Sequence, residues 1–271
     1  MIINNREFDI KNNTYIMGIL NVTPDSFSDG GKFNSLDGAK RQVQQMIEDG
    51  AHIIDVGGES TRPGYVKISD EEEVQRTVYI IEMIRKEFDF PVSTDTYKSG
   101  VALAAIQAGA GLVNDIWGFK YDKNMAKVVA KNNVACCLMH NREIKEYNNL
   151  IEDVISDLDE SLKIALEAGV DKDKIILDPG IGFGKTYEHN MLMIKEIEKL
   201  NVLGYPILLG TSRKSCIGLT LDTDVNNRME GTLATTAYGM LKAKACFYRV
   251  HDVLENARLI KMIQAIENTE G

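Results

Sequence analysis

The chain has 271 residues, a length that suits one (β/α)8 barrel of about 250 residues. Hydrophobic residues make up 44% of it and charged residues 26%, the composition of a soluble globular protein with an ample core. The formal net charge of −9 argues against a surface for nucleic acid or an anionic membrane, so we expect neither as a partner. No apolar run approaches the ~20 residues of a membrane helix, and the N-terminus lacks a signal-peptide pattern. The sequence therefore predicts a cytoplasmic protein.

The four cysteines have no CxxC spacing, and the four histidines have no spacing typical of zinc ligands. We predict that Cys136, Cys137, Cys216 and Cys246 are small core residues in a reducing compartment.

Eight short β-branched segments alternate along the chain with segments of helical periodicity. Ser69 and Glu72 make a capping box before one of the predicted helices. Eight such units favour a parallel sheet closed into a barrel, and no linker divides the chain, so we predict a single (β/α)8 TIM barrel over residues 1–271. The predicted strands are 15–20, 52–56, 91–94, 111–114, 134–139, 174–177, 206–209 and 246–250.

Polar side chains gather where these predicted strands end, which is where (β/α)8 barrels carry their chemistry. Purely structural barrel ends do not usually concentrate so many amide, carboxylate and cationic groups, so the sequence predicts an enzyme. The main polar residues at these ends are Asn21, Asp55, Asp95, Asn114, Asp115, His140, Asp178, Ser212, Arg213, Lys214, Arg249, His251 and Asp252.

Six segments at these ends resemble, in order, the signature blocks of the dihydropteroate synthase family, which are pterin-binding TIM barrels. The segments are MGILNVTPDSFSDGG (17–31), DVGGESTRPG (55–64), NDI (114–116), LDPGIGFGK (177–185), GTSRKS (210–215) and RVHD (249–252). A single block would be weak, but six in register over nearly the whole chain are specific.

The resemblance implies a reaction in folate biosynthesis, with Mg²⁺ as cofactor. The family condenses 6-hydroxymethyl-7,8-dihydropterin diphosphate with p-aminobenzoate, and 7,8-dihydropteroate and diphosphate are the products. Dissociative cleavage of the C–O bond leaves a pterin methyl cation and a departing polyanion, which together require carboxylates and cations. The family is the sulfonamide target of folate synthesis, and the resemblance also implies a homodimer formed through helices late in the chain.

The resemblance assigns Asp95, Asp178 and Lys214 to catalysis. A carboxylate such as Asp178 suits the paired donors on the guanidine-like edge of a pterin, and Asn114 can both donate and accept. The full pterin-binding set implied by the resemblance is Asp95, Asn114, Met139, Asp178, Phe183, Lys214 and Arg249.

The remaining assignments concern the other substrate groups. The resemblance assigns diphosphate binding to Thr61, Arg62, Arg249 and His251. The p-aminobenzoate site would be shaped by Phe27, Pro63 and Ser212, and Asn21 matches the family's Mg²⁺ ligand.

Several polar residues favour structural roles instead. We interpret Asp55 as part of a buried network, Asp115 and Asp252 as structural, and His140 as a structural histidine with no evident partner. The chain departs from the family pattern over 141–149, and Cys216 stands where a bulky aromatic residue is common.

Three alternatives stay open at this point. A pterin-dependent methyltransferase shares the barrel and the pterin-facing acids. A Schiff-base aldolase could use Lys214 as its nucleophile. A paralogue could bind pterin without catalysing condensation.

Overall fold

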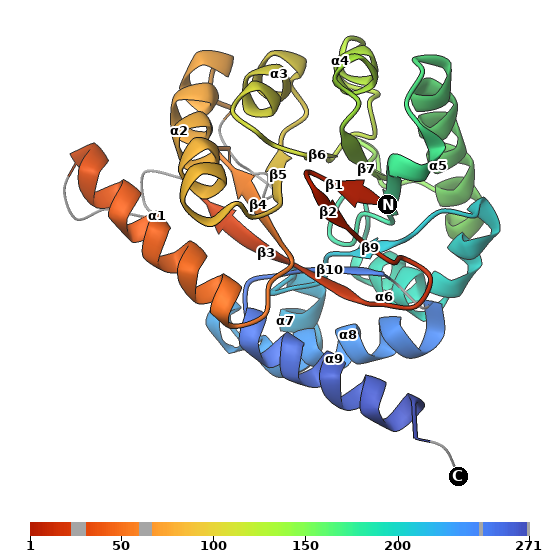
Figure 1. The fold of residues 1–271 in the computed structure, drawn as a ribbon. Coiled ribbons are helices and arrows are strands. Elements are labelled where there is room, and N and C mark those ends of the chain that lie inside the picture. Colours follow the sequence, from red (N-terminus) through yellow and green to blue (C-terminus); the bar gives the residue numbers. More distant parts are fainter. Residues whose placement is uncertain (23–30, 60–66, 244–245, 270–271) are drawn as a thin grey trace.

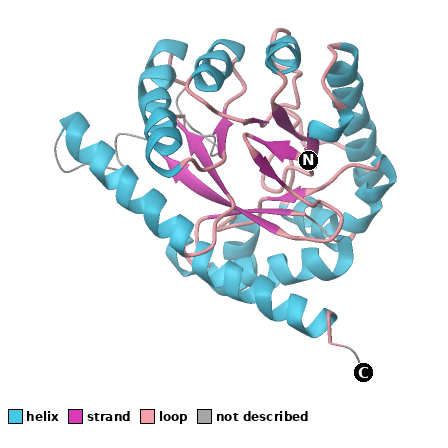
Figure 2. Ribbon diagram, in the orientation of Figure 1, coloured by secondary structure: helices cyan, strands magenta, loops and turns pink. Residues whose placement is uncertain are grey.

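A computed structural model describes residues 1–22, 31–59, 67–243 and 246–269, with the side chains of 31–35 left aside. Parallel strands form a central sheet in the order β8-β7-β6-β5-β4-β3-β10-β9, and helices surround it (Figures 1 and 2). The barrel closes between β8 and β9 through a parallel bridge from Leu177 to Ile207. The strands are β3 (Tyr15–Asn21), β4 (Ile53–Gly57), β5 (Val92–Asp95), β6 (Leu112–Asp115), β7 (Ala135–Met139), β8 (Ile175–Asp178), β9 (Leu208–Leu209) and β10 (Phe247–Val250).

The predicted (β/α)8 barrel is therefore confirmed, and each predicted strand corresponds to an observed one within about two residues. The strands are buried along almost their whole length because the barrel interior covers one face and the helices cover the other. The differences in boundaries are informative. Asn21, Asp95 and Asp178 prove to be the last residues of their strands, so their backbone is held by the sheet.

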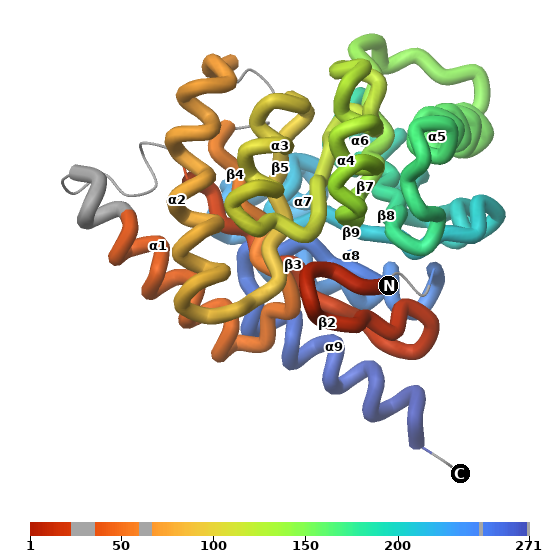
Figure 3. Tube along the Cα trace, turned by 45° about the horizontal axis from the view of Figure 1, so that its top comes forward, coloured from red at the N-terminus to blue at the C-terminus, as the bar shows by residue number. Residues whose placement is uncertain are grey.

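Helices follow the strands in chain order, and successive helices contact one another around the barrel (Figure 3). Ser69 is the N-cap of α2 and accepts a hydrogen bond from the amide of Glu72, as the capping pattern predicts. No described helix is long and apolar enough to cross a membrane. The helices are α1 (Gly31–Glu48), α2 (Asp70–Phe88), α3 (Ser99–Gln107), α4 (Met125–Asn132), α5 (Leu150–Glu167), α6 (Tyr187–Lys195), α7 (Ser215–Leu221), α8 (Met229–Ala243) and α9 (Val253–Glu267).

An N-terminal hairpin, β1 (Ile2–Ile3) paired with β2 (Arg6–Glu7), was not predicted. Ile3 and Phe8 pack with residues that begin the barrel strands, and Figure 1 shows the hairpin lying over them. The side chain of Asn4 bonds both the Gly109 carbonyl (2.8 Å) and the Val92 amide (3.1 Å). The hairpin thus closes the N-terminal end of the barrel and leaves the C-terminal end for ligands.

All four cysteines are buried, as predicted. Cys216 is 2% exposed, which confirms its interpretation as a packing residue.

Candidate active site

The strand register brings predicted site residues into one row at the C-terminal end of the barrel. Asn21 is the neighbour of Gly57, Gly57 of Asp95, and Asp95 of Asn114. Gly57 leaves room in this row, because an added Cβ would lie 3.5 Å from Asp95 Cβ and 3.8 Å from Asn21 Oδ1. On the opposite side of the barrel, Met139 is the neighbour of Asp178.

Arg249 lies between two buried carboxylates. Its Nε donates to Asp55 Oδ2 and its Nη2 donates to Asp95 Oδ2, both at 2.6 Å. Asp55 is fully buried, so its interpretation as a network residue is confirmed. In this structure the Arg249 guanidinium therefore pairs with buried carboxylates inside the site, and one of them is the predicted pterin-binding acid Asp95.

The carboxylates of Asp55 and Asp95 each keep one buried oxygen, Oδ1, without a hydrogen-bond partner. An orphaned buried acceptor is costly, and a ligand donor would relieve that cost. Burial raises the pKa of Asp95 to about 7, and the Asp55 charge adds to the rise while Arg249 opposes it. Asp95 is thus suited to accept a hydrogen bond from a ligand that enters the barrel.

Asp178 ends β8 and is 5% exposed. Its Oδ1 accepts the Gly180 amide at 2.7 Å, which ties the carboxylate to the turn that follows. Burial raises the pKa of Asp178, while this backbone bond and the charge of Lys214 act in the opposite direction. Gly180 has φ +69°, and a Cβ there would lie 1.9 Å from the His140 carbonyl oxygen, so the turn requires glycine.

Lys214 and Phe183 contact each other, and the charge of Lys214 acts on Asp178. The Lys214 ammonium is 4.1 Å from the centre of the Phe183 ring, a cation–π contact. Burial lowers the pKa of Lys214 to about 8, with a further decrease from Arg249 and opposing effects of Asp178 and Asp95. Phe183 also packs against a small buried cluster that contains Met139. Lys214, Phe183 and Met139 therefore form a connected wall with a cationic, an aromatic and an apolar part.

Ser212 and His251 contact each other directly. The His251 amide donates to Ser212 Oγ at 3.1 Å, and Ser212 Oγ lies 2.9 Å from His251 Nδ1. Since the hydroxyl hydrogen can point to Nδ1, the neutral imidazole would carry its proton on Nε2. The nearby Asp252 pairs with Arg213 (2.5 Å), which confirms the structural interpretation of Asp252.

Four predicted site residues, Phe27, Thr61, Arg62 and Pro63, lie outside the described residues. In the part of the chain that is described, no group of three or more His, Cys, Asp or Glu is arranged to hold a metal ion. Asn21 does offer a hard amide oxygen at the barrel mouth, partly exposed and next to the row of acids. Mg²⁺ commonly takes only one or two protein ligands and fills its other positions with phosphate oxygens and water. A site with Asn21 fits that mode.

Two of the residues interpreted as structural also have visible partners. Asp115 accepts the amides of Trp117 (2.8 Å) and Phe119 (3.1 Å) and so closes a turn. His140, which had no evident partner in the sequence, contacts Asp157 at 3.0 Å and Lys185 at 2.7 Å. No sequence pattern indicates the role of Asp157, which lies 17 residues from His140 on α5. Lys185 belongs to a signature block but received no role.

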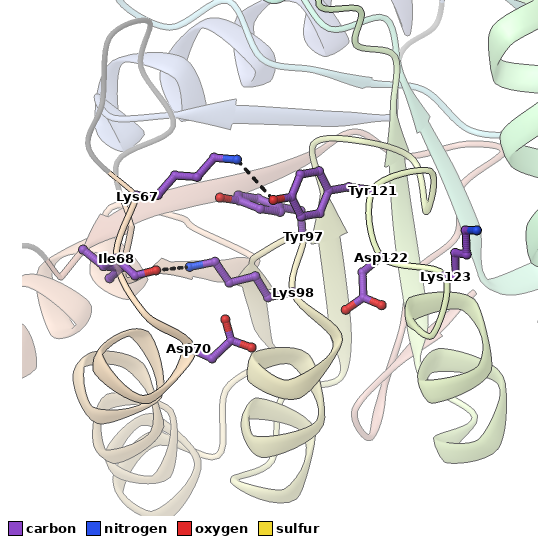
Figure 4. A pocket seen from close by; sticks show the side chains of 8 residues that line it. All are labelled: Lys67, Ile68, Asp70, Tyr97, Lys98, Tyr121, Asp122 and Lys123. Carbon is purple, nitrogen blue, oxygen red and sulfur yellow. Dashed lines mark hydrogen bonds between the residues drawn. The ribbon is translucent and has the colours of Figure 1, made fainter.

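A second buried network was also missed by sequence reasoning. Glu59 accepts the Tyr97 hydroxyl (2.6 Å) and the Lys98 ammonium (2.8 Å), and Lys98 also pairs with Glu73. Lys98 also donates to the Ile68 carbonyl, and both residues line a pocket whose side chains Figure 4 shows. The volume of this pocket is about 570 Å³. This pocket lies between the beginnings of α2, α3 and α4 and contains none of the predicted site residues.

Comparison with known proteins places the chain in a family. The family model described as "Pterin binding enzyme" matches residues 17–251. The dihydropteroate synthase of Clostridium beijerinckii is 62% identical over 266 residues, which cover 98% of this chain and 99% of that protein. The chain therefore belongs to the family of pterin binding enzymes. Within that family, the dihydropteroate synthase of Bacillus subtilis is also similar, with 55% identity over 262 residues that cover 96% of this chain and 91% of that protein.

Solved structures agree with this placement. A crystal structure of dihydropteroate synthase from Clostridium difficile in the presence of pteroic acid has a TM-score of 0.94 and 47% identity, and covers 97% of this chain and all of that one. The Yersinia pestis dihydropteroate synthase in a sulfonamide complex has a TM-score of 0.92 and 36% identity, with 99% of each chain covered.

Proposed function

We propose that this chain is a dihydropteroate synthase that joins 6-hydroxymethyl-7,8-dihydropterin diphosphate to p-aminobenzoate. The observation that carries the proposal is the convergence of Asp95, Asp178 and Lys214 at the barrel mouth of a chain whose close relatives bear that name. The same relatives favour the synthase over the methyltransferase and the aldolase considered from the sequence.

The pterin would bind between the acids and the Phe183–Lys214 wall. Asp178 has one carboxylate oxygen bonded to Gly180 and can offer the other to the paired donors of the pterin edge. Asp95 Oδ1 can accept a hydrogen bond from the heterocycle, and the buried amide of Asn114 can both donate and accept. These two groups suit a ring that carries both donors and acceptors. Lys214 would donate to the oxygen-bearing edge, and Met139 and Phe183 would contact the ring.

In the reaction, the C–O bond to diphosphate breaks and the C–N bond to the aryl amine forms, and the amine loses one proton. Positive charge develops on the pterin methylene carbon during cleavage. The carboxylates of Asp95 and Asp178 stabilise that charge in a site from which water is largely removed. Arg249, His251, Thr61 and Arg62 would hold the departing diphosphate.

Ser212, with Phe27 and Pro63, would position p-aminobenzoate, and the contact between Ser212 and His251 would bring the amine close to the leaving group. Asn21 would hold Mg²⁺ together with diphosphate oxygens, and the bound ion would neutralise charge on the leaving group. Sulfonamides resemble p-aminobenzoate, so they would occupy the same place.

The direct test mixes purified protein with Mg²⁺, the dihydropterin diphosphate and labelled p-aminobenzoate. We expect labelled dihydropteroate and free diphosphate to form in equal amounts, and a sulfonamide to compete with p-aminobenzoate. Pterin binding with no product would favour a non-catalytic paralogue, and no pterin binding would contradict the site.

A homodimer is also part of the proposal. The neighbouring helices α6, α7 and α8 expose apolar side chains that include Leu192 (41%), Leu219 (68%) and Leu241 (62%). An exposed apolar patch of this kind is typical of an interface, and we assign it to a second copy of the chain.

Leu219→Glu should therefore shift the protein from dimer to monomer, because a buried unpaired charge would oppose the interface. Light scattering after size-exclusion chromatography measures the mass. Met262→Glu, at an apolar residue on α9 that is 60% exposed, is the matched control and should leave the mass unchanged. A dimeric Leu219→Glu protein would contradict this interface.

We also assign the protein to the cytoplasm, where buried thiols stay reduced.

A further inference from the structure

Lys185 is a buried cation at the end of the glycine-rich loop that follows β8. It is 4% exposed, and its ammonium contacts three acceptors. These are His140 Nδ1 at 2.7 Å, the Gly180 carbonyl at 3.1 Å and the Phe183 carbonyl at 3.2 Å. Three acceptors require three N–H donors, which the charged ammonium has and the neutral amine lacks. Lys185 thus joins both ends of the loop to the end of β7.

The proton positions in this cluster follow from its partners. An ammonium can only donate, so His140 Nδ1 must accept from Lys185. The imidazole proton then lies on Nε2 and is donated to Asp157 Oδ2, 3.0 Å away. Burial lowers the pKa of His140 to about 4, which agrees with a neutral ring. Burial also lowers the pKa of Lys185 to about 7, while the charges of Asp178 and Asp157 act to raise it.

The segment that departs from the family pattern, 141–149, supports this cluster from outside. Arg142 holds Asp157 through Nε at 2.6 Å and Nη2 at 3.1 Å. The Tyr147 hydroxyl donates to the Gly184 carbonyl at 2.7 Å. The unusual residues therefore bond the same loop that Lys185 bonds, on its outer side.

The loop has little freedom to move without disturbing the proposed pterin site. Gly182 lies against Lys214, since an added Cβ would be 3.0 Å from Lys214 Cδ. Phe183 contacts the Lys214 ammonium, and Gly180 donates to Asp178. A displaced loop would therefore displace the aromatic wall and free one oxygen of Asp178.

We propose that Lys185 is a positioning residue for pterin binding, which it serves by holding the loop of Gly180–Phe183 against His140 and, through His140, against Asp157. The proposal rests on the pterin site described under the proposed function. Lys185 acts through the backbone and makes no contact with substrate.

The first test is Lys185→Met, which keeps an unbranched side chain and removes all three donors. The probe is 6-hydroxymethylpterin, which reports on the pterin pocket without diphosphate or metal. We expect its Kd, and the KM for the dihydropterin diphosphate, to rise by about tenfold or more, as the loss of charge-assisted bonds implies. The KM for p-aminobenzoate should stay within about twofold, a split that general loosening of the fold would not produce.

The second test is Asp157→Asn, which lies on α5 outside the barrel mouth and protects the conclusion if Lys185→Met fails to fold. An amide in place of the carboxylate leaves one donor facing a donor of Arg142 or His140, and it removes a charge that favours the ammonium. We expect the Kd for 6-hydroxymethylpterin to rise in this variant too, by a smaller factor than in Lys185→Met. The matched control is Asp159→Asn on the same helix, where an exposed carboxylate pairs with Lys163. It should behave like the unmodified protein.

The outcomes separate the two proposals. Folded Lys185→Met and Asp157→Asn proteins that bind 6-hydroxymethylpterin as the unmodified chain does would overturn the role of Lys185. If Asp178→Asn also binds this probe normally, the pterin site itself is wrong. If Asp178→Asn loses the probe while the Lys185 and Asp157 variants keep it, only the positioning role fails.

Discussion

Asp178→Asn should reduce turnover by about 10³-fold while the protein stays folded. The change keeps the shape of the side chain but replaces one acceptor by a donor. Because one oxygen already accepts the Gly180 amide, either that bond or the bond to the pterin must face a donor–donor contact. The charge that would stabilise the pterin cation is lost as well.

The measurement is single-turnover formation of labelled dihydropteroate, together with a thermal melt of each variant. Asp159→Asn removes a carboxylate of the same kind from an exposed position and should retain full activity. A rate for Asp178→Asn close to that of the unmodified chain would show that the pterin does not use this acid.

Arg249→Leu should destabilise the protein by about 3 kcal/mol or more at pH 8, because it leaves Asp55 and Asp95 buried without their cation. The pKa of Asp95 is raised to about 7 even with Arg249 present. The folded state then holds a proton that the unfolded chain, with an ordinary pKa of 3.8, releases. Stability therefore falls as the pH rises from about 4 towards 7, and in the variant, where Arg249 no longer lowers the pKa of Asp95, the fall should continue to a higher pH.

Urea unfolding at pH 5 and pH 8 measures both effects. We expect the variant to recover part of its stability at pH 5, where a proton can replace the lost cation on one carboxylate. The control is Arg213→Leu, which breaks a partly exposed pair with Asp252 and should cost less than about 1 kcal/mol, with little change between the two pH values. Equal unfolding midpoints for Arg249→Leu and the unmodified protein at pH 8 would contradict this account.

Much of the barrel was predictable because its strands are buried on both faces and end in polar residues. That pattern is local, so Ile175–Asp178 and its counterparts could be found to within about two residues. The hairpin of Ile2–Ile3 and Arg6–Glu7 was missed because strands of two residues carry no periodicity. Its stability comes from contacts such as that between Asn4 and Gly109, which are remote in sequence.

The candidate site shows the same division. The sequence indicates that Asp95 and Asp178 end their strands, as they do in the structure, and that Lys214 follows the seventh strand, where the structure has it as the N-cap of α7. It could not show that Arg249 pairs with Asp55, because 194 residues separate them. Nor could it assign Lys185, because its ammonium contacts His140, which follows another strand, and His140 in turn contacts Asp157 on a helix. Local pattern reveals which side chains reach the mouth of the barrel, and three-dimensional packing decides what holds them there.

The pairing of β10 with β3 has a consequence for the synthesis of the chain. Val250 is the neighbour of Gly18 in the folded barrel. The second edge of β3 therefore stays unpaired until β10 is present. Arg249 lies on that same final strand, and until this strand is present Asp55 and Asp95 lack the guanidinium that pairs with both of them. A nascent chain that has not yet released β10 should therefore keep its acidic centre hydrated and open, which delays assembly of the binding site until that strand has been made.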